Sequence, residues 1–207
     1  LMEWIAQAIG ADNVIWIGAI RVMHGPKAAD DPFLGWRLRV RRPLRPDPEP
    51  YRSQLSAYYT KDHYGKLTPS FYDRSHGPKK EAHVGLTSRA SMVGAGKFRV
   101  HRLRDGWIDF AEFRRSLHYR LYYGEAGIRD RIWIGYPVAE GRESFLLIDR
   151  FQPSGARLRP TFTQRQAALA GDAARGLPEF HRRLFLSSGL MTSDKPLTPT
   201  EQEILRG

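Results

Sequence analysis

Hydrophobic and polar positions along the chain switch repeatedly between the spacing of helices and that of strands. Apolar residues three and four positions apart indicate helices, and short β-branched or aromatic runs indicate strands. This pattern predicts helices over residues 2–10, 51–64, 109–123 and 163–186, and strands over residues 14–22, 35–44, 98–103, 131–138 and 143–150. The order is that of an α+β fold rather than of regular βαβ units, and we expect an antiparallel sheet flanked by helices.

Local signals mark the ends of several elements. Thr163 and Gln166 have the spacing of a capping box, so the closing helix should begin there. Pro178 should split that helix near Leu177, because proline lacks a backbone donor and clashes with the preceding turn. Residues 65–97 are rich in Gly, Ser, Pro and Lys and predict loop with one weak helix.

Composition describes a folded chain without sulfur-based cross-links. The sequence has 207 residues, 41% of them hydrophobic and none of them cysteine. That length is sufficient for one large domain with its own core, and disulfides and cysteine-ligated zinc are excluded. No apolar run approaches the roughly 20 residues of a membrane span. We therefore expect a cytoplasmic location and no membrane partner.

The chain is strongly basic, with 33 Lys and Arg against 22 Asp and Glu and a net charge of +11. Such an excess favours polyanions as partners. Arg37, Arg39 and Arg41 alternate along a predicted strand, which would place them on one face, with Leu38 and Val40 on the other. These arginines are the candidate nucleic-acid contacts, although the same charges also suit a solvated outer face.

Patterns typical of catalysis or metal binding are lacking in the sequence. Seven histidines show no metal-ligand spacing, and no G-x-S-x-G nucleophile motif occurs. The run Val93-Gly-Ala-Gly-Lys97 resembles a phosphate loop, but Ser91 stands where the first glycine belongs and Phe98 where Ser or Thr belongs. We expect no enzymatic activity, no cofactor and no metal.

Aromatic residues supply the remaining candidate chemistry. Aromatic walls with a few polar groups are typical of small-ligand pockets. The same spacing along helices and strands also suits plain core packing. The candidate ligand-binding residues are Tyr58, Tyr59, His118, Tyr122 and Trp133.

The last residues, 197–207, have the signals of a helix that has just begun. Thr198 and Glu201 form a capping box, Pro199 occupies the first helical position, and Ile204 starts an apolar face. The sequence ends about two turns later. We expect the packing partner of this helix to lie outside the chain.

Three segments resemble known regulators. Residues 197–207 resemble the first helix of the LuxR-type helix-turn-helix, whose opening is Leu-Thr-Pro-x-Glu-x-Glu-x-Leu. Residues 119–150 look like the GAF-like sensors that precede such domains, and Phe-Thr-Gln-Arg-Gln at 162–166 is similar to their Phe-Thr-Glu-Arg-Asp. The resemblance covers residues 98–207 well and residues 1–97 poorly.

The resemblance implies a division of the chain and a function. Residues 1–186 would be a GAF-like sensor, 187–196 a linker, and 197–207 the start of a truncated DNA-binding domain. The protein would be a homodimeric transcriptional regulator that responds to a small effector or a partner, and it would contact DNA through a domain not contained in this chain. The alternatives are a self-contained basic nucleic-acid-binding module and, third, an enzyme of unknown class.

Overall fold

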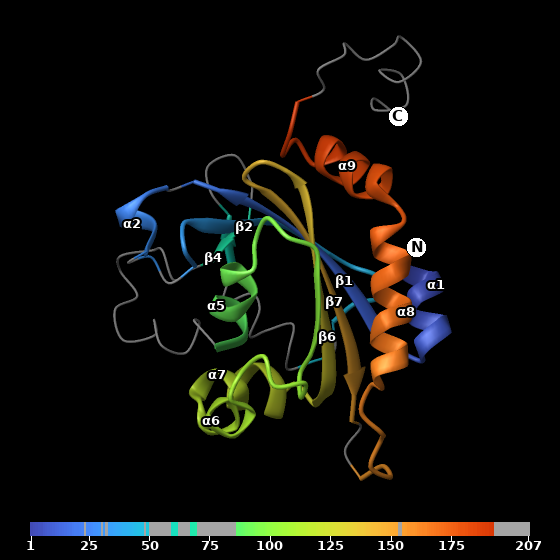
Figure 1. Cartoon of the computed structure of the whole chain (residues 1–207). Helices are drawn as coiled ribbons and strands as arrows, with labels where there is room; N and C mark the ends of the chain where they lie inside the picture. Colours follow the sequence, from blue (N-terminus) through green and yellow to red (C-terminus); the bar gives the residue numbers. More distant parts are fainter. Residues whose placement is uncertain are drawn as a thin grey trace.

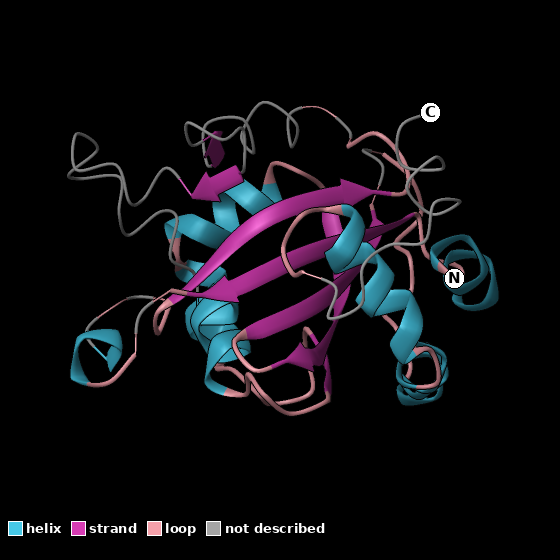
Figure 2. Ribbon diagram, turned by 90° about the horizontal axis from the view of Figure 1, so that it is seen from above, coloured by secondary structure: helices cyan, strands magenta, loops and turns pink. Residues whose placement is uncertain are grey.

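The protein, seen as a computed structural model, is an antiparallel sheet covered on both faces by helices (Figures 1 and 2). This arrangement confirms the predicted α+β class. The structure describes residues 1–22, 24–29, 31, 33–47, 49, 59–61, 67–69, 86–152 and 155–192.

The main sheet has five strands in the order β2-β1-β7-β6-β5, and every neighbouring pair is antiparallel. Its strands are β1 (Asn13–Arg21), β2 (Trp36–Pro43), β5 (Arg99–Arg102), β6 (Ile128–Ala139) and β7 (Arg142–Phe151). β6 and β7 form a hairpin, and β1 lies beside β7 although far from it in sequence. A separate pair joins β3 (Tyr59–Lys61) to β4 (Leu67–Pro69).

Helices occupy both sides of this sheet. The described helices are α1 (Met2–Ile9), α2 (Pro26–Ala29), α5 (Leu86–Val93), α6 (Phe110–Arg115), α7 (Leu117–Tyr119), the π-helical turn η3 (Arg120–Gly124), α8 (Gln164–Arg175) and α9 (Pro178–Ser187). Both hydrogen bonds of the predicted capping box of Thr163 and Gln166 are present at the start of α8. Pro178 is the first residue of α9, so the predicted split beside Leu177 is confirmed.

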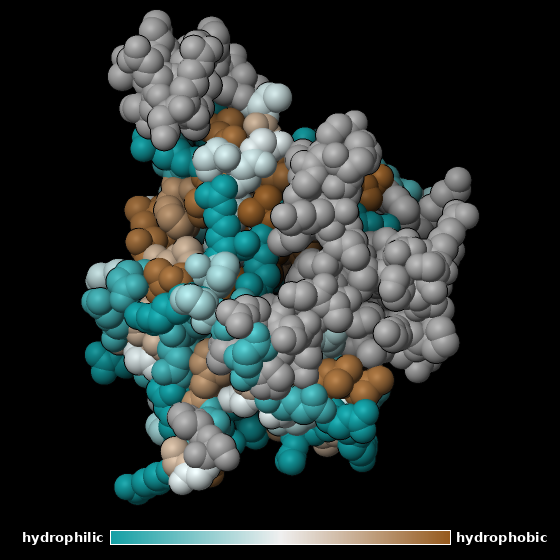
Figure 3. Space-filling model, turned by 180° about the vertical axis from the view of Figure 1, so that it is seen from behind, coloured by the Kyte–Doolittle hydropathy of each residue, from teal (hydrophilic) through white to brown (hydrophobic). Residues whose placement is uncertain are grey.

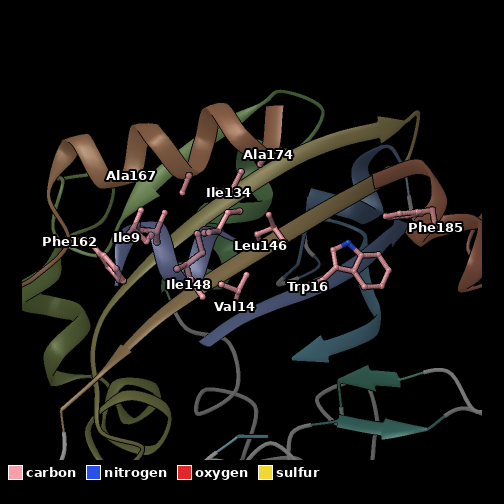
Figure 4. Close-up of a cluster of buried hydrophobic side chains, with 14 of the residues drawn as sticks. Ile9, Val14, Trp16, Ile134, Leu146, Ile148, Phe162, Ala167, Ala174 and Phe185 are labelled. Carbon is pink, nitrogen blue, oxygen red and sulfur yellow. The ribbon is translucent and has the colours of Figure 1, made fainter. Parts of the chain in front are cut away.

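Two hydrophobic cores lie on opposite faces of the sheet, because successive strand residues point to opposite sides. One face, called the helix face, packs against α1, α8 and α9 (Figure 4). Its largest buried residues include Trp16, Ile132, Ile134, Leu146, Phe162 and Phe185. The opposite face, called the pocket face because a cavity lies against it, packs against α5 and the segment from α6 to η3. Its core includes Ile15, Ile17, Phe113, Tyr123, Trp133 and Phe145.

Two helix predictions need correction. Residues 59–61 form β3, whereas the sequence predicted a helix over 51–64; residues 51–58 and 62–64 lie outside the described part. Tyr59 and Thr60 are aromatic and β-branched, and pairing with β4 stabilises the extended form that these residue types prefer. The predicted helix over 109–123 is broken at Ser116, whose backbone is extended and whose hydroxyl caps the next turn.

A bulge interrupts β2. In the register with β1, Leu38 lies opposite Ala19 and Val40 lies opposite Gly18, so Arg39 is the extra residue. Leu38 accordingly packs on the pocket face and Val40 on the helix face. A single inserted residue reverses the side to which all following side chains point.

This bulge overturns the predicted row of three arginines. Arg37 lies opposite Ile20, which packs on the helix face, whereas Arg41 lies opposite Ile17 on the pocket face. The prediction assumed unbroken alternation and is wrong on this point. Contact with nucleic acid through Arg37, Arg39 and Arg41 stays a prediction.

The surface of the described part mixes hydrophobic and hydrophilic positions, as the face in Figure 3 shows. Exposed large hydrophobic residues, such as Trp4, Val93 and Leu158, come from separate elements. Among the described helices, none combines the length and the apolar character needed to cross a membrane.

Candidate ligand pocket

A cavity of about 90 Å³ lies between the pocket face of the sheet and the helices α5 and α7–η3. Three of the predicted ligand residues, His118, Tyr122 and Trp133, line it together. Tyr58 and the side chain of Tyr59 lie outside the described part of the chain. The cavity is smaller than the few hundred cubic ångströms typical of sites for drug-sized ligands, so it suits a compact ligand.

Strand alternation sets the position of Trp133. Ile132 and Ile134 are buried on the helix face, which turns Trp133 toward the cavity with only 5% of its surface exposed. Its indole ring packs against Tyr123, with ring centroids 6.5 Å apart. The sheet therefore supplies one rigid aromatic wall.

The turn from α7 into η3 supplies the opposite wall. His118 and Tyr122, four residues apart, lie with their ring centroids 4.9 Å apart. The widened π-helical turn Arg120–Gly124 contains Tyr122 and Tyr123, and both tyrosines are buried against the pocket face. Such π-helical turns are frequent at functional sites. The local backbone thus brings two adjacent tyrosines and one histidine to the cavity.

Arg131 adds a cationic group that the sequence reasoning did not single out. Its guanidinium forms a bidentate pair with the fully buried Asp149, and Nη2 lies 2.7 Å from Oδ2. Its Nη1 donates to the Tyr123 hydroxyl at 3.2 Å. The guanidinium carbon lies 5.0 Å from the centroid of the Tyr123 ring and 5.7 Å from that of Trp133. Arg131 is two residues before Trp133, so strand periodicity could have placed it on the same face.

Arg41 is the second guanidinium at the cavity. Its Nη1 and Nη2 lie 2.5 and 2.7 Å from the two carboxylate oxygens of Asp47. Both side chains are at least nine-tenths buried. The sequence suggested Arg41 as a nucleic-acid contact, but the structure places it on the pocket face, at the wall of the cavity.

The described residues that line the cavity give it a positive character. They include two guanidinium groups and no carboxylate. Asp149 and Asp47 pair with the arginines but are not among the lining residues. Each ion pair therefore presents its positive end to the cavity. A negative or acceptor-rich group would be stabilised there.

Helix α5 forms a further wall and is held to the sheet by the guanidinium of Arg99, which also forms a buried ion pair with Glu143. Arg99 Nη2 donates to the Ser91 carbonyl at 2.7 Å, and Nη1 donates to Glu143 at 2.5 Å. Glu143 also accepts from the Gly96 N–H at 2.9 Å, and burial raises its pKa. Gly135 leaves room for this arrangement, because a Cβ there would lie 2.5 Å from the Arg99 guanidinium carbon.

A second polar cluster, on the helix face, contains a serine and a histidine. Ser144 Oγ lies 2.8 Å from His181 Nδ1 and accepts from Trp16 Nε1 at 2.8 Å. His181 Nε2 lies 3.0 Å from the Ala174 carbonyl oxygen. Ser144 and His181 have no exposed surface, so a substrate cannot reach the hydroxyl. The cluster joins α8, α9 and the sheet instead of forming a nucleophile.

The buried imidazole of His181 should make the stability of the protein depend on pH. Burial lowers the pKa of His181 below its ordinary value of about 6.5, so the unfolded chain binds more protons in that range. The free energy of unfolding should be highest above that pH and should fall as the pH drops from 7 to 5. His181→Gln, which keeps a donor toward Ala174, should reduce this fall. Denaturant titrations at several pH values measure the effect.

The control is His24→Gln, since His24 is exposed. A residual fall should persist in His181→Gln, because burial also lowers the pKa of His101. An unchanged pH dependence in His181→Gln would show that His181 is not the neutral buried group described here.

The described part of the chain holds no group of three or more His, Asp or Glu side chains able to bind a metal ion. The chain matches no protein-family model, no curated protein and no solved structure. The resemblance of residues 98–207 to GAF-like sensors and to the LuxR-type helix-turn-helix that follows them stays a prediction.

Proposed function

We propose that residues 1–186 form a small-molecule sensor domain of a LuxR-type transcriptional regulator. The observation that carries the proposal is the cavity that His118 of α7 and Tyr122 of η3 line together with Trp133 of the sheet. A concave, mostly aromatic site with a few fixed polar groups is the usual form of a ligand pocket. The capping box and apolar pattern of residues 197–207 support the regulatory context, although those residues lie outside the described part.

A ligand in this cavity would contact elements that lead toward the end of the domain. Strand β7 lines the cavity through Phe145. The neighbouring Ser144 points to the opposite face, where its hydroxyl forms a hydrogen bond with His181 of α9. Arg142 of the same strand donates to the carbonyl of Leu190, just after α9, at 3.1 Å. A ligand that favours one packing of β7 would therefore bias the position of α9 and of the following linker.

A cavity-filling variant tests the sensor proposal. Ser88→Phe on α5 should block the cavity, whereas Arg89→Phe on the same helix changes an exposed residue. A compound present at about 100 times its Kd should stabilise the unsubstituted protein by about 2.7 kcal/mol, or roughly 5–10 °C in Tm. We expect a thermal-shift screen of small molecules to yield such compounds.

The two variants decide where those compounds bind. The shift should vanish in Ser88→Phe and persist in Arg89→Phe. Stabilisation that survives in Ser88→Phe would place the ligand elsewhere, and a screen without any stabilising compound would contradict the sensor proposal.

A self-contained nucleic-acid-binding module is the second candidate, and the net charge of +11 favours it. The coding sequence beyond residue 207 separates the two candidates. A regulator requires a second and a third amphipathic helix there, the third being the one that enters the major groove. A coding sequence without them would favour the basic module.

A further inference from the structure

We propose that the cavity selects a compact aromatic anion, namely a single aromatic ring that carries a carboxylate. This inference rests on the proposed function, because it identifies the chemical class of ligand for the same site. Three features of the described lining support it: its charge, its aromatic walls and its size.

The charge of the lining favours an anion over a cation. Arg41 and Arg131 face the cavity, and their partners Asp47 and Asp149 lie behind them, outside the lining. Each guanidinium is paired with its carboxylate through two N–H donors. The pairing also holds each guanidinium in one orientation, so a bound anion need not order a mobile side chain.

The aromatic walls favour a flat ligand body. Tyr122, Tyr123 and Trp133 line the cavity from two layers, together with Phe33 and Phe145. Aromatic rings attract one another through offset and edge-to-face contacts that an aliphatic chain does not offer. Arg131, held close to the rings of Tyr123 and Trp133, places a cation directly beside this aromatic surface.

The size of the cavity limits the ligand to about one ring. One water requires roughly 10–15 Å³ on this volume scale, so 90 Å³ holds roughly six to nine water-sized groups. A nucleotide or a long acyl chain exceeds that space. A benzoate-sized molecule fits it, with the ring among the aromatic side chains and the carboxylate toward the guanidinium groups.

Three isosteric probes test the charge preference at pH 7: benzoate, benzamide and benzamidinium. They share one ring and a planar substituent but differ in charge from −1 to +1. Isothermal titration calorimetry of the whole chain should show benzoate binding at least about tenfold more tightly than benzamide, a difference of about 1.4 kcal/mol. Benzamidinium should show no binding. The aromatic chemical shifts of Trp133 should change on addition of benzoate.

A matched pair of variants assigns the preference to the pocket. Arg41→Gln removes a guanidinium of the lining, whereas Arg37→Gln breaks a similarly buried bidentate pair with Asp31 that lies outside it. The benzoate preference should disappear in Arg41→Gln and persist in Arg37→Gln. Arg41→Lys, which retains the charge without the planar fork, should retain part of it. Melting temperatures of the variants show that each is folded.

The outcomes separate this inference from the proposed function. Binding of benzamide or benzamidinium as tight as that of benzoate would overturn the anion preference. If Ser88→Phe abolished the binding of these probes, the result would still support the sensor proposal. Equal loss of benzoate binding in Arg37→Gln and Arg41→Gln would also overturn it. Absence of binding by all three probes overturns the inference, and the thermal-shift screen then decides the sensor proposal independently.

Discussion

Replacing Arg131 with methionine is expected to lower the free energy of unfolding by about 3–5 kcal/mol, because it leaves the carboxylate of Asp149 buried without its counter-charge. Asp149 has no exposed surface, so its carboxylate depends on Arg131 for a counter-charge. Urea titration of the two proteins measures the difference. The surface pair of Arg183 and Glu179 provides the control, and Arg183→Met should change stability by less than about 0.5 kcal/mol.

The double variant Arg131→Met/Asp149→Leu separates the structural role of the pair from its role in the pocket. Replacing both charges by apolar groups removes the unpaired carboxylate, and such replacements are often neutral or stabilising. We expect most of the lost stability to return, while the preference for benzoate over benzamide does not. A double variant as unstable as Arg131→Met would contradict this account. A double variant that keeps the benzoate preference would show that Arg131 does not hold the anion.

Local chemistry explains which parts of the fold the sequence could predict. The capping box at Thr163, the split before Pro178 and the end of α1 at Gly10 depend on residues within a few positions of each other. The strands of the main sheet were predicted for the same reason, since their residue types and alternation are visible in short windows. The α+β class followed from the order of these elements.

Long-range pairing explains what could not be predicted. The bulge at Arg39 is defined only by the register of β2 against β1, so alternation alone misplaced the neighbouring arginines. The strand β3 depends on its pairing with β4, which local patterns do not show. The break at Ser116 is visible locally only as a serine in a helix, a position where serine often occurs without breaking it.

The candidate site shows the same division. The sequence predicted His118, Tyr122 and Trp133 as ligand-binding residues, and in the structure all three line one cavity. Arg131 shares the face of Trp133, but its identity as a fixed cation depends on Asp149, eighteen residues away and on another strand. The pairing of Arg131 with Asp149 follows from the register of β6 against β7, which the residue types alone do not show.

Helix α9 links the sheet to the residues that precede the proposed DNA-binding domain, and Phe185 is its main anchor. Phe185 is fully buried on the helix face and packs edge-on against Trp16, with ring centroids 5.8 Å apart (Figure 4). Phe185→Ala should therefore lower the free energy of unfolding by about 3–5 kcal/mol, from lost burial and the cavity that remains. Leu169→Ala, at an exposed position of α8, should change it by less than about 0.5 kcal/mol.

The same variant tests whether α9 carries the signal. The ligand cavity lies on the opposite face of the sheet, so Phe185→Ala should still bind benzoate at a temperature where it remains folded. Hydrogen exchange of α9 amides should increase in the variant, because the helix loses its largest buried contact. In the unsubstituted protein, benzoate should change the exchange of α9 amides, and this change should disappear in Phe185→Ala. Benzoate-dependent exchange in α9 that survives the substitution would show that the signal reaches α9 without the Trp16–Phe185 contact.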